Sequence, residues 1–163
     1  IDEEHLMPNI EKLRECGVIC DVHEDKMIVD GTGDKFPVDI KTMPYPGFPT
    51  DMQSQMMALL CTCQGSTFIK ENLFEARFKI VDELNKMGAA IKIKDCTAYI
   101  EGEKALHGET ICAKDLRGGA ALVLAGLVAE GCTIVKQIEH IERGYQNIIL
   151  DLSKLGAHIQ ERK

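Results

Sequence analysis

The chain has 163 residues, of which 45% are apolar and 28% are charged, and its formal net charge is −7 at pH 7. This composition is typical of one soluble, globular domain and excludes a disordered chain, while the acidic balance argues against broad attraction to nucleic acid. No apolar run approaches the ~18 residues of a membrane span, and the first ten residues lack the basic and apolar regions of a signal peptide. We therefore expect neither nucleic acid nor a membrane as a partner.

The first predicted elements are an amphipathic helix and a β-hairpin. In the segment NIEKLRECGVI (9–19), apolar residues recur at helical spacing, and Gly17 follows Leu13 by four residues as a helix stop. The next fourteen residues, to Gly31, alternate as two short strands around a charged turn. The sequence DGTGDKF (30–36) follows this hairpin and opens no helix, so it predicts a turn and not a nucleotide-binding loop.

A strongly apolar helix is predicted next, within PTDMQSQMMALLCTCQGSTFI (49–69). Thr50 as N-cap and Gln53 three residues later predict a capping box, and Asp51 in the first turn favours the helix dipole. The helix stops at Gly65 and passes into a β-rich stretch. Because it has no polar face, we expect it to be buried on all sides.

Both kinds of helix recur along the chain. The segments KIVDELNKMGAAI (79–91) and NIILDLSKLGAHI (147–159) repeat the amphipathic pattern, and a second hairpin is predicted over 88–102. DLRGGAALVLAGLVAEGCTIV (115–135) repeats the apolar helix when Gly131 is laid on Gly65, an offset of 66 residues. The same offset aligns the two helix starts, which carry Asp51 and Arg117.

The repeated unit is therefore strand, buried helix, strand, amphipathic helix and hairpin, which predicts an α/β fold. Residues 1–39 correspond to the back half of a first unit, 40–104 to a second and 105–163 to a third whose hairpin is incomplete. Since a repeat domain rarely begins in the middle of a unit, residues 1–163 are interpreted as a partial domain of a larger protein.

Four polar residues at the predicted helix starts are candidates for a site. Arg117 stands in the first turn of its helix, where a cation opposes the macrodipole unless an anion is near. It follows Asp115, the predicted N-cap, and precedes two glycines that permit close approach of a backbone or ligand. An ion pair with Asp115 or with another domain would explain Arg117 equally well. Together with Arg77, Arg143 and the acid Asp51, however, it suggests a site for a small, multiply charged anion.

The cysteines and histidines suggest no metal site. The seven cysteines form no CxxC pair and lie near no His doublet, and the five histidines are scattered. Because the number of cysteines is odd and their spacing suits no disulfide framework, free thiols in a reducing cytoplasm are expected.

Four motifs carry a resemblance to a known family: YPGFPTDMQSQ, ENLFEARF, DLRGGAALVLAGLVAEG and IERGYQNIILDLSKLGA. In order and separation they resemble the C-terminal part of the UDP-N-acetylglucosamine 1-carboxyvinyltransferases, the MurA-type enolpyruvyl transferases. The resemblance implies the enolpyruvyl transferase fold, an inside-out α/β barrel with the apolar helices packed inside. It also implies transfer of enolpyruvyl from phosphoenolpyruvate to the 3′-hydroxyl of UDP-N-acetylglucosamine, the first committed step of peptidoglycan synthesis, without a cofactor.

The resemblance also implies a role for each candidate residue. Asp51 takes the proton of the hydroxyl; Arg77 and Arg117 hold the phosphoenolpyruvate carboxylate, and Arg143 contacts the phosphate. Asp115 orients the arginines, while Leu73 and Phe74 line the sugar-nucleotide site.

The chain departs from the family pattern in three respects. FEARF has Ala76 where the family has Asn, CTCQGSTFIKENLF differs from the usual phrasing, and the N-terminal motifs with the reactive cysteine are absent. The chain is therefore expected to form one wall of the active site, to need the missing N-terminal domain as its partner, and to be inactive alone. The alternatives are an enzyme like 5-enolpyruvylshikimate-3-phosphate synthase and a non-catalytic module that binds a UDP-sugar.

Overall fold

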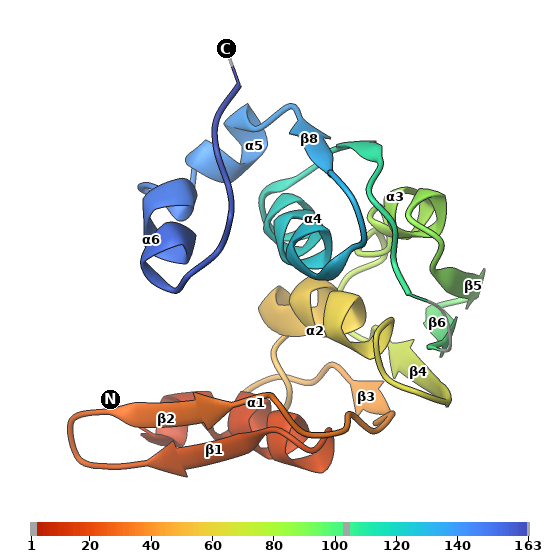
Figure 1. Cartoon of the computed structure of the whole chain (residues 1–163). Coiled ribbons are helices and arrows are strands. Elements are labelled where there is room, and N and C mark those ends of the chain that lie inside the picture. The colour runs from red at the N-terminus through yellow and green to blue at the C-terminus, as the bar shows by residue number, and fades with distance from the viewer. Residues whose placement is uncertain (1–2, 103–104, 163) are drawn as a thin grey trace.

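The computed structural model describes residues 3–102 and 105–162 (Figure 1). Its elements in chain order are α1 (Glu3–Glu15), β1 (Ile19–Val22), β2 (Met27–Asp30), β3 (Ile40–Lys41), the 3-10 turn η1 (Thr50–Met52), α2 (Gln53–Leu60), β4 (Ser66–Lys70), α3 (Val81–Lys86), β5 (Ala90–Lys94), β6 (Thr97–Glu101), β7 (Thr110–Cys112), α4 (Leu116–Val128), β8 (Ile134–Lys136), α5 (Glu139–Glu142) and α6 (Ile148–Lys154).

The predicted order of strand, helix, strand, helix and hairpin is present from β3 to β6, and its strand, helix and strand recur from β7 to β8. Strands β3 and β4 are parallel neighbours with α2 between them along the chain, and β7 and β8 are parallel neighbours with α4 between them. Both apolar helices lead to a glycine with positive φ, Gly65 at 120° and Gly131 at 93°. The hairpin β5–β6 joins the first pair to give a four-stranded sheet of order β3-β4-β6-β5, and β1–β2 forms the hairpin after α1.

The three amphipathic helices end in the same way. Gly17, Gly88 and Gly156 have φ values of 88°, 96° and 94°, in the left-handed region that glycine tolerates. In each case the N–H after the glycine donates to the carbonyl of the leucine four residues before it, at 3.0, 3.1 and 3.0 Å. This is the Schellman pattern, and it explains why leucine and glycine recur at that spacing.

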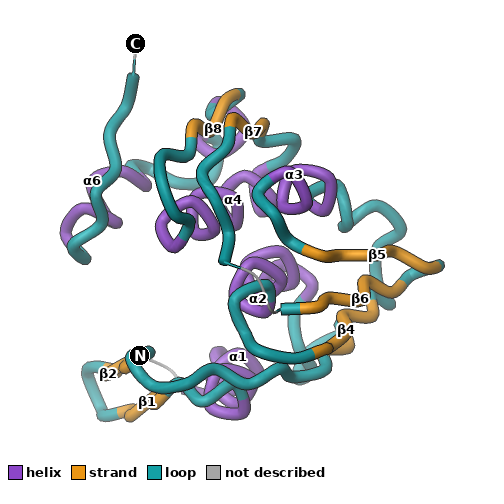
Figure 2. Tube along the Cα trace, turned by 45° about the vertical axis from the view of Figure 1, so that its right-hand side comes forward, coloured by secondary structure: helices purple, strands orange, loops and turns teal. Residues whose placement is uncertain are grey.

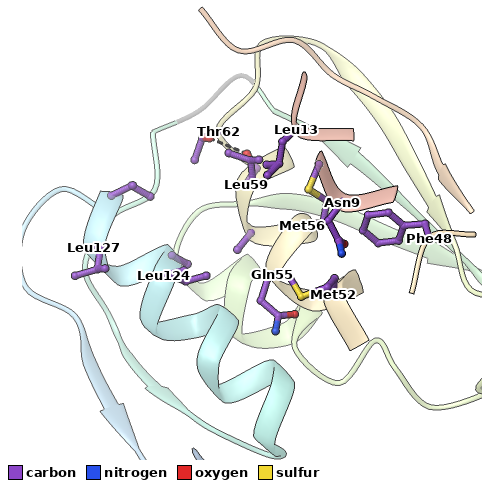
Figure 3. A pocket seen from close by; sticks show the side chains of 13 residues that line it. Asn9, Leu13, Phe48, Met52, Gln55, Met56, Leu59, Thr62, Leu124 and Leu127 are labelled. Atoms are coloured by element: carbon purple, nitrogen blue, oxygen red, sulfur yellow. Dashed lines mark hydrogen bonds between the residues drawn. The ribbon is translucent and has the colours of Figure 1, made fainter. Parts of the chain in front are cut away.

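Helices α2 and α4 pack against each other at the centre of the fold (Figures 1 and 2). Most of α2 is buried, as expected. The expectation that α4 is buried on all sides is wrong for its last turns, because Leu124, Leu127 and Val128 are 38%, 38% and 61% exposed. These side chains help to line a groove of about 390 Å³ that also involves α1 and α2 (Figure 3).

Two further features were not predicted. Helix α5 lies between β8 and α6 as an additional turn, and α1 begins at Glu3, ahead of the repeated segment and with Pro8 inside it. Over the described residues 157–162 there is no strand.

A buried carboxylate joins α3 to the third unit. Glu83, whose side chain is 3% exposed, accepts hydrogen bonds from Lys86 Nζ at 2.9 Å and from the Cys112 N–H at 3.1 Å, and it pairs with Lys114 Nζ at 3.1 Å. Burial alone would raise the pKa of Glu83, but these donors outweigh it and hold the pKa below the ordinary value of 4.5.

Candidate functional site

A carboxylate and a guanidinium from the two repeated helix starts meet at one end of the α2–α4 pair. Asp51 lies in the turn that leads into α2, and Arg117 lies in the first turn of α4. Arg117 Nε is 2.6 Å from Asp51 Oδ1, and its Nη2 donates to Oδ2 at 2.7 Å. The pair is bidentate, which is the favoured geometry for guanidinium and carboxylate. Because the helices pack side by side, residues 66 positions apart are brought into contact.

A second guanidinium approaches the same carboxylate. Arg77 Nη2 donates to Asp51 Oδ1 at 3.3 Å, and the Arg77 guanidinium lies over the Phe74 ring, 4.5 Å from its centroid. The side chain of Asp51 is 55% exposed and that of Arg117 is 35% exposed, so the cluster is open to solvent. Two cations around one carboxylate leave net positive charge, which suits the site to a small anion.

The structure shows which anion lies beside Arg117 in the first turn of α4. Asp115 caps α4 as predicted, since its carboxylate accepts from the Gly118 N–H at 2.8 Å. The alternative in which Arg117 pairs with Asp115 is wrong, because the partner of Arg117 is Asp51. That carboxylate offsets the unfavourable interaction of a cation with the N-terminal end of the helix dipole.

The predicted capping box at the start of α2 is also wrong. Pro49 occupies the cap position of η1, and no side chain caps the turn. The Thr50 hydroxyl instead donates to Glu71 Oε2 at 2.9 Å. The Thr50 hydroxyl therefore serves as a donor to a side chain outside the helix and not as an acceptor for a helix N–H.

The two glycines that directly follow Arg117 face side chains of this chain, since a Cβ on Gly118 would lie 3.2 Å from Asp115 Oδ2. A Cβ on Gly119 would lie 2.7 Å from Ile141 Cγ1, so glycine is what lets α5 pack on the first turns of α4. A Cβ on Gly144 would likewise lie 2.7 Å from Leu116 Cδ1. Arg143 therefore stands beside the start of α4.

The remaining predicted residues flank the cluster to different degrees. Arg143, at the end of α5, is exposed and forms no ion pair with Asp51 among the residues that the structure describes. Leu73 and Phe74, between β4 and α3, are 39% and 55% exposed. The structure thus joins Asp51, Arg77 and Arg117 directly.

Sequence reasoning missed Glu71, and the available clue was that this acidic residue directly follows the β-rich stretch after Gly65. It is 3% exposed and accepts a hydrogen bond from Thr50, the residue before Asp51.

Within residues 3–102 and 105–162, no three His, Cys, Asp or Glu side chains are grouped so that they could hold a metal ion. In the same part of the chain, no helix has both the length and the apolar character needed to cross a membrane.

The chain matches known sequences along nearly its whole length. The family model described as EPSP synthase (3-phosphoshikimate 1-carboxyvinyltransferase) matches residues 4–162. A UDP-N-acetylglucosamine 1-carboxyvinyltransferase of Desulfofundulus thermocisternus is 56% identical over 155 residues, which are 95% of this chain and 64% of that protein. UDP-N-acetylglucosamine 1-carboxyvinyltransferase 2 of Clostridium tetani is 54% identical over 98% of this chain and 38% of its own length. The chain thus spans from under two-fifths to under two-thirds of these relatives.

Solved structures resemble the fold. The enolpyruvyl transferase NikO from Streptomyces tendae superposes with a TM-score of 0.86 and 33% identity, over 95% of this chain and 36% of that one. An EPSP synthase from Acinetobacter baumannii superposes with a TM-score of 0.64 over 88% of this chain and 35% of that one. At 19% identity, this second likeness supports the fold alone.

Proposed function

The chain belongs to the EPSP synthase (3-phosphoshikimate 1-carboxyvinyltransferase) family, and from that premise we propose that the intact protein is a UDP-N-acetylglucosamine 1-carboxyvinyltransferase. It transfers enolpyruvyl from phosphoenolpyruvate to the 3′-hydroxyl of UDP-N-acetylglucosamine and releases phosphate. The names of the relatives at 54–56% identity favour this acceptor over shikimate 3-phosphate. On this proposal the protein acts in the cytoplasm at the first committed step of peptidoglycan synthesis.

The observation that carries the proposal is one carboxylate held by two guanidiniums at an open site. Asp51 is the general base, which removes the proton of the 3′-hydroxyl as its oxygen bonds to C2 of phosphoenolpyruvate and C3 gains a proton. Loss of phosphate from C2 and of one proton from C3 then restores the double bond. Arg77 and Arg117 hold the substrate carboxylate, and they stabilise an intermediate that carries both carboxylate and phosphate charges. Both already meet Asp51, at 3.3 and 2.6 Å, so they are arranged before the substrate arrives.

The other residues complete the proposed site around this centre. Arg143 contacts the phosphate, and its place beside the start of α4 supports that role. Leu73 and Phe74 line the sugar-nucleotide site, for which their exposure leaves them available. Asp115 orients Arg117 through the helix start that it caps.

Phosphate release by the full-length protein tests the activity. With phosphoenolpyruvate, we expect release when UDP-N-acetylglucosamine is the acceptor and none when shikimate 3-phosphate replaces it. The reverse result would make the protein an EPSP synthase-like enzyme. Binding of UDP-N-acetylglucosamine without phosphate release would identify a non-catalytic module.

We also propose that the chain is part of an inside-out barrel domain. Residues 1–39 are the back half of a first unit, 40–104 the second and 105–163 the third, and a separate N-terminal domain supplies the opposite wall of the site. The apolar groove between α1, α2 and α4 supports this arrangement, since it offers a place for the apolar helix of the first unit (Figure 3). Leu13, Leu59 and Leu124 are among its lining residues.

Two polar atoms in the groove indicate which hydrogen-bonding groups its occupant would supply. The side-chain oxygens of Asn9 and Gln55 are buried along it without a hydrogen-bond partner among the described residues. A helix that fills the groove is therefore expected to present hydrogen-bond donors there as well as apolar side chains.

Substitution in the full-length protein tests the packing. We expect Leu127→Asp to lower its melting temperature strongly, because it places a charge between packed helices. Ile93→Asp, on strand β5 and 48% exposed, is the matched control and should change it little. Equal effects of the two would refute the docked helix.

A further inference from the structure

Glu71 is a buried carboxylate whose partners belong to two different loops. It directly follows β4, and the residue is 3% exposed. Oε1 accepts from the Thr42 hydroxyl at 2.7 Å and from the N–H groups of Leu73 and Phe74 at 2.8 and 3.2 Å, while Oε2 accepts from the Thr50 hydroxyl at 2.9 Å. Since no Lys or Arg among the described residues pairs with it, these four donors compensate for its burial.

The partners of Glu71 connect the two loops that carry the charged cluster. Thr50 immediately precedes Asp51, and Leu73 and Phe74 begin the loop that leads to Arg77. The Thr42 hydroxyl adds a second connection, since it also accepts a hydrogen bond from the Asn72 N–H at 2.9 Å. Glu71 therefore links the backbone beside Asp51 to the backbone of the Arg77 loop.

The contacts of Asp51 and of Glu71 together connect the two loops in a closed ring. On its exposed side, Asp51 meets Arg77 at 3.3 Å; on its buried side, Thr50 meets Glu71 at 2.9 Å. The exposed contact is a single hydrogen bond at solvent, which cannot by itself fix the relative position of the loops. Of the four Glu71 contacts, the one with Thr42 is buried and the other three are partly buried, so together they are the stronger constraint.

We propose that Glu71 is a positioning residue that sets the place of Asp51 relative to Arg77 and Phe74. It acts through hydrogen bonds to both loops and touches no substrate. This inference rests on the proposed function for its kinetic test, although the geometry that it concerns can be measured without any reaction.

Two variants of Glu71 distinguish the effect of its hydrogen bonds from the effect of its charge. In Glu71→Gln the amide oxygen can accept from Thr42, Leu73 and Phe74, while the amide nitrogen donates to Thr50, whose hydroxyl rotates to accept. Glu71→Ala leaves all four donors without a partner. We therefore expect Glu71→Gln to keep most of the activity and Glu71→Ala to lose kcat by on the order of 100-fold, the effect of misplacing a catalytic group by about 1 Å.

Thr50→Val removes one link only, and Thr67→Val is its matched control. Thr67 is also a buried threonine, 6% exposed, but its hydroxyl bonds Val38 and Asp39 at the opposite end of the β3–β4 pair. In the full-length protein, assayed for phosphate release per folded enzyme, we expect Thr50→Val to lower kcat at least about tenfold with KM for UDP-N-acetylglucosamine little changed. Thr67→Val should lower stability without lowering kcat.

Three results would overturn the inference: unchanged kcat in Thr50→Val, an equal loss in Thr67→Val, or a Glu71→Gln variant as inactive as Glu71→Ala. A wild-type protein that releases no phosphate would instead refute the proposed function. In that case crystal structures of wild type and Glu71→Ala decide, because an Asp51–Arg77 contact that is unchanged in the variant would overturn the positioning role.

Discussion

Replacing Asp51 by alanine in the full-length protein should abolish turnover and leave the fold nearly intact. The carboxylate is 55% exposed and its partners are two arginines, so the ion pairs contribute about 0–1 kcal/mol to stability. Its place in the first turn before α2 adds about 0.3–1 kcal/mol through the helix dipole. The total of about 0.3–2 kcal/mol corresponds to a fall in melting temperature of at most about 8 °C for a domain of this size.

The expected kinetic effect is far larger. Loss of a positioned general base lowers the rate by about 10²–10⁴-fold. Asp151→Ala is the matched control, because Asp151 is also an exposed aspartate, 69% exposed, that pairs with a helical Lys154 at 3.8 Å. Calorimetry and a phosphate-release assay on the same preparations measure both quantities.

Two results would refute this reasoning. A fall in melting temperature much beyond 8 °C in Asp51→Ala would mean that the carboxylate serves mainly to hold the start of α2. Turnover equal to that of Asp151→Ala would mean that another group accepts the proton.

Three further predictions concern the anion site, a buried carboxylate and a helix stop. Arg117→Ala should raise KM for phosphoenolpyruvate about 10–100-fold, the value of a lost charged hydrogen bond, and an unchanged KM would contradict the anion site. Because the pKa of Glu83 is lowered in the folded protein, its contribution to stability is present above about pH 4.5 and is lost as the pH falls through the lower folded value. In urea unfolding of the full-length protein, Glu83→Gln should therefore be less stable than wild type at pH 7, and the difference in unfolding free energy should become smaller below pH 4.5. A difference that does not change with pH would contradict a lowered pKa of Glu83. Gly88→Ala should cost about 1–2 kcal/mol of unfolding free energy, since φ is 96° there and a Cβ would lie 2.7 Å from the His107 ring, whereas Gly33→Ala, which meets nothing within 4 Å, should change little.

The sequence predicted the repeat well because its determinants are local. Leucine and glycine four residues apart encode a helix end with its own hydrogen bonds, and that pattern is the same at Gly17, Gly88 and Gly156. The exposed face of α4 could not be predicted in the same way. Leu124 and Val128 are apolar, but their burial depends on what packs against them, and neither α1 nor α2 covers them.

The hydrogen bond of Thr50 could not be predicted from the residues near it in the sequence. Thr50 followed by Gln53 satisfies the local rule for a capping box, yet its hydroxyl bonds a carboxylate 21 residues further along the chain. Nothing within a few residues of Thr50 indicates that partner, because the contact exists only after β3 and β4 have paired. A local propensity of about 1 kcal/mol is readily outweighed when the hydroxyl can satisfy a buried acceptor.

The Asp51–Arg117 pair joins residues that are distant in the sequence, like the Thr50 contact, but it can be related to the sequence through the repeat. Laying one unit on the other puts the two residues at equivalent helix starts, and apolar helices without a polar face must pack together. Opposite charges at equivalent ends of two packed helices then attract, whereas two like charges would repel. The repeat therefore predicts the meeting of the two starts, while the bidentate geometry and the approach of Arg77 depend on the loop that Glu71 holds.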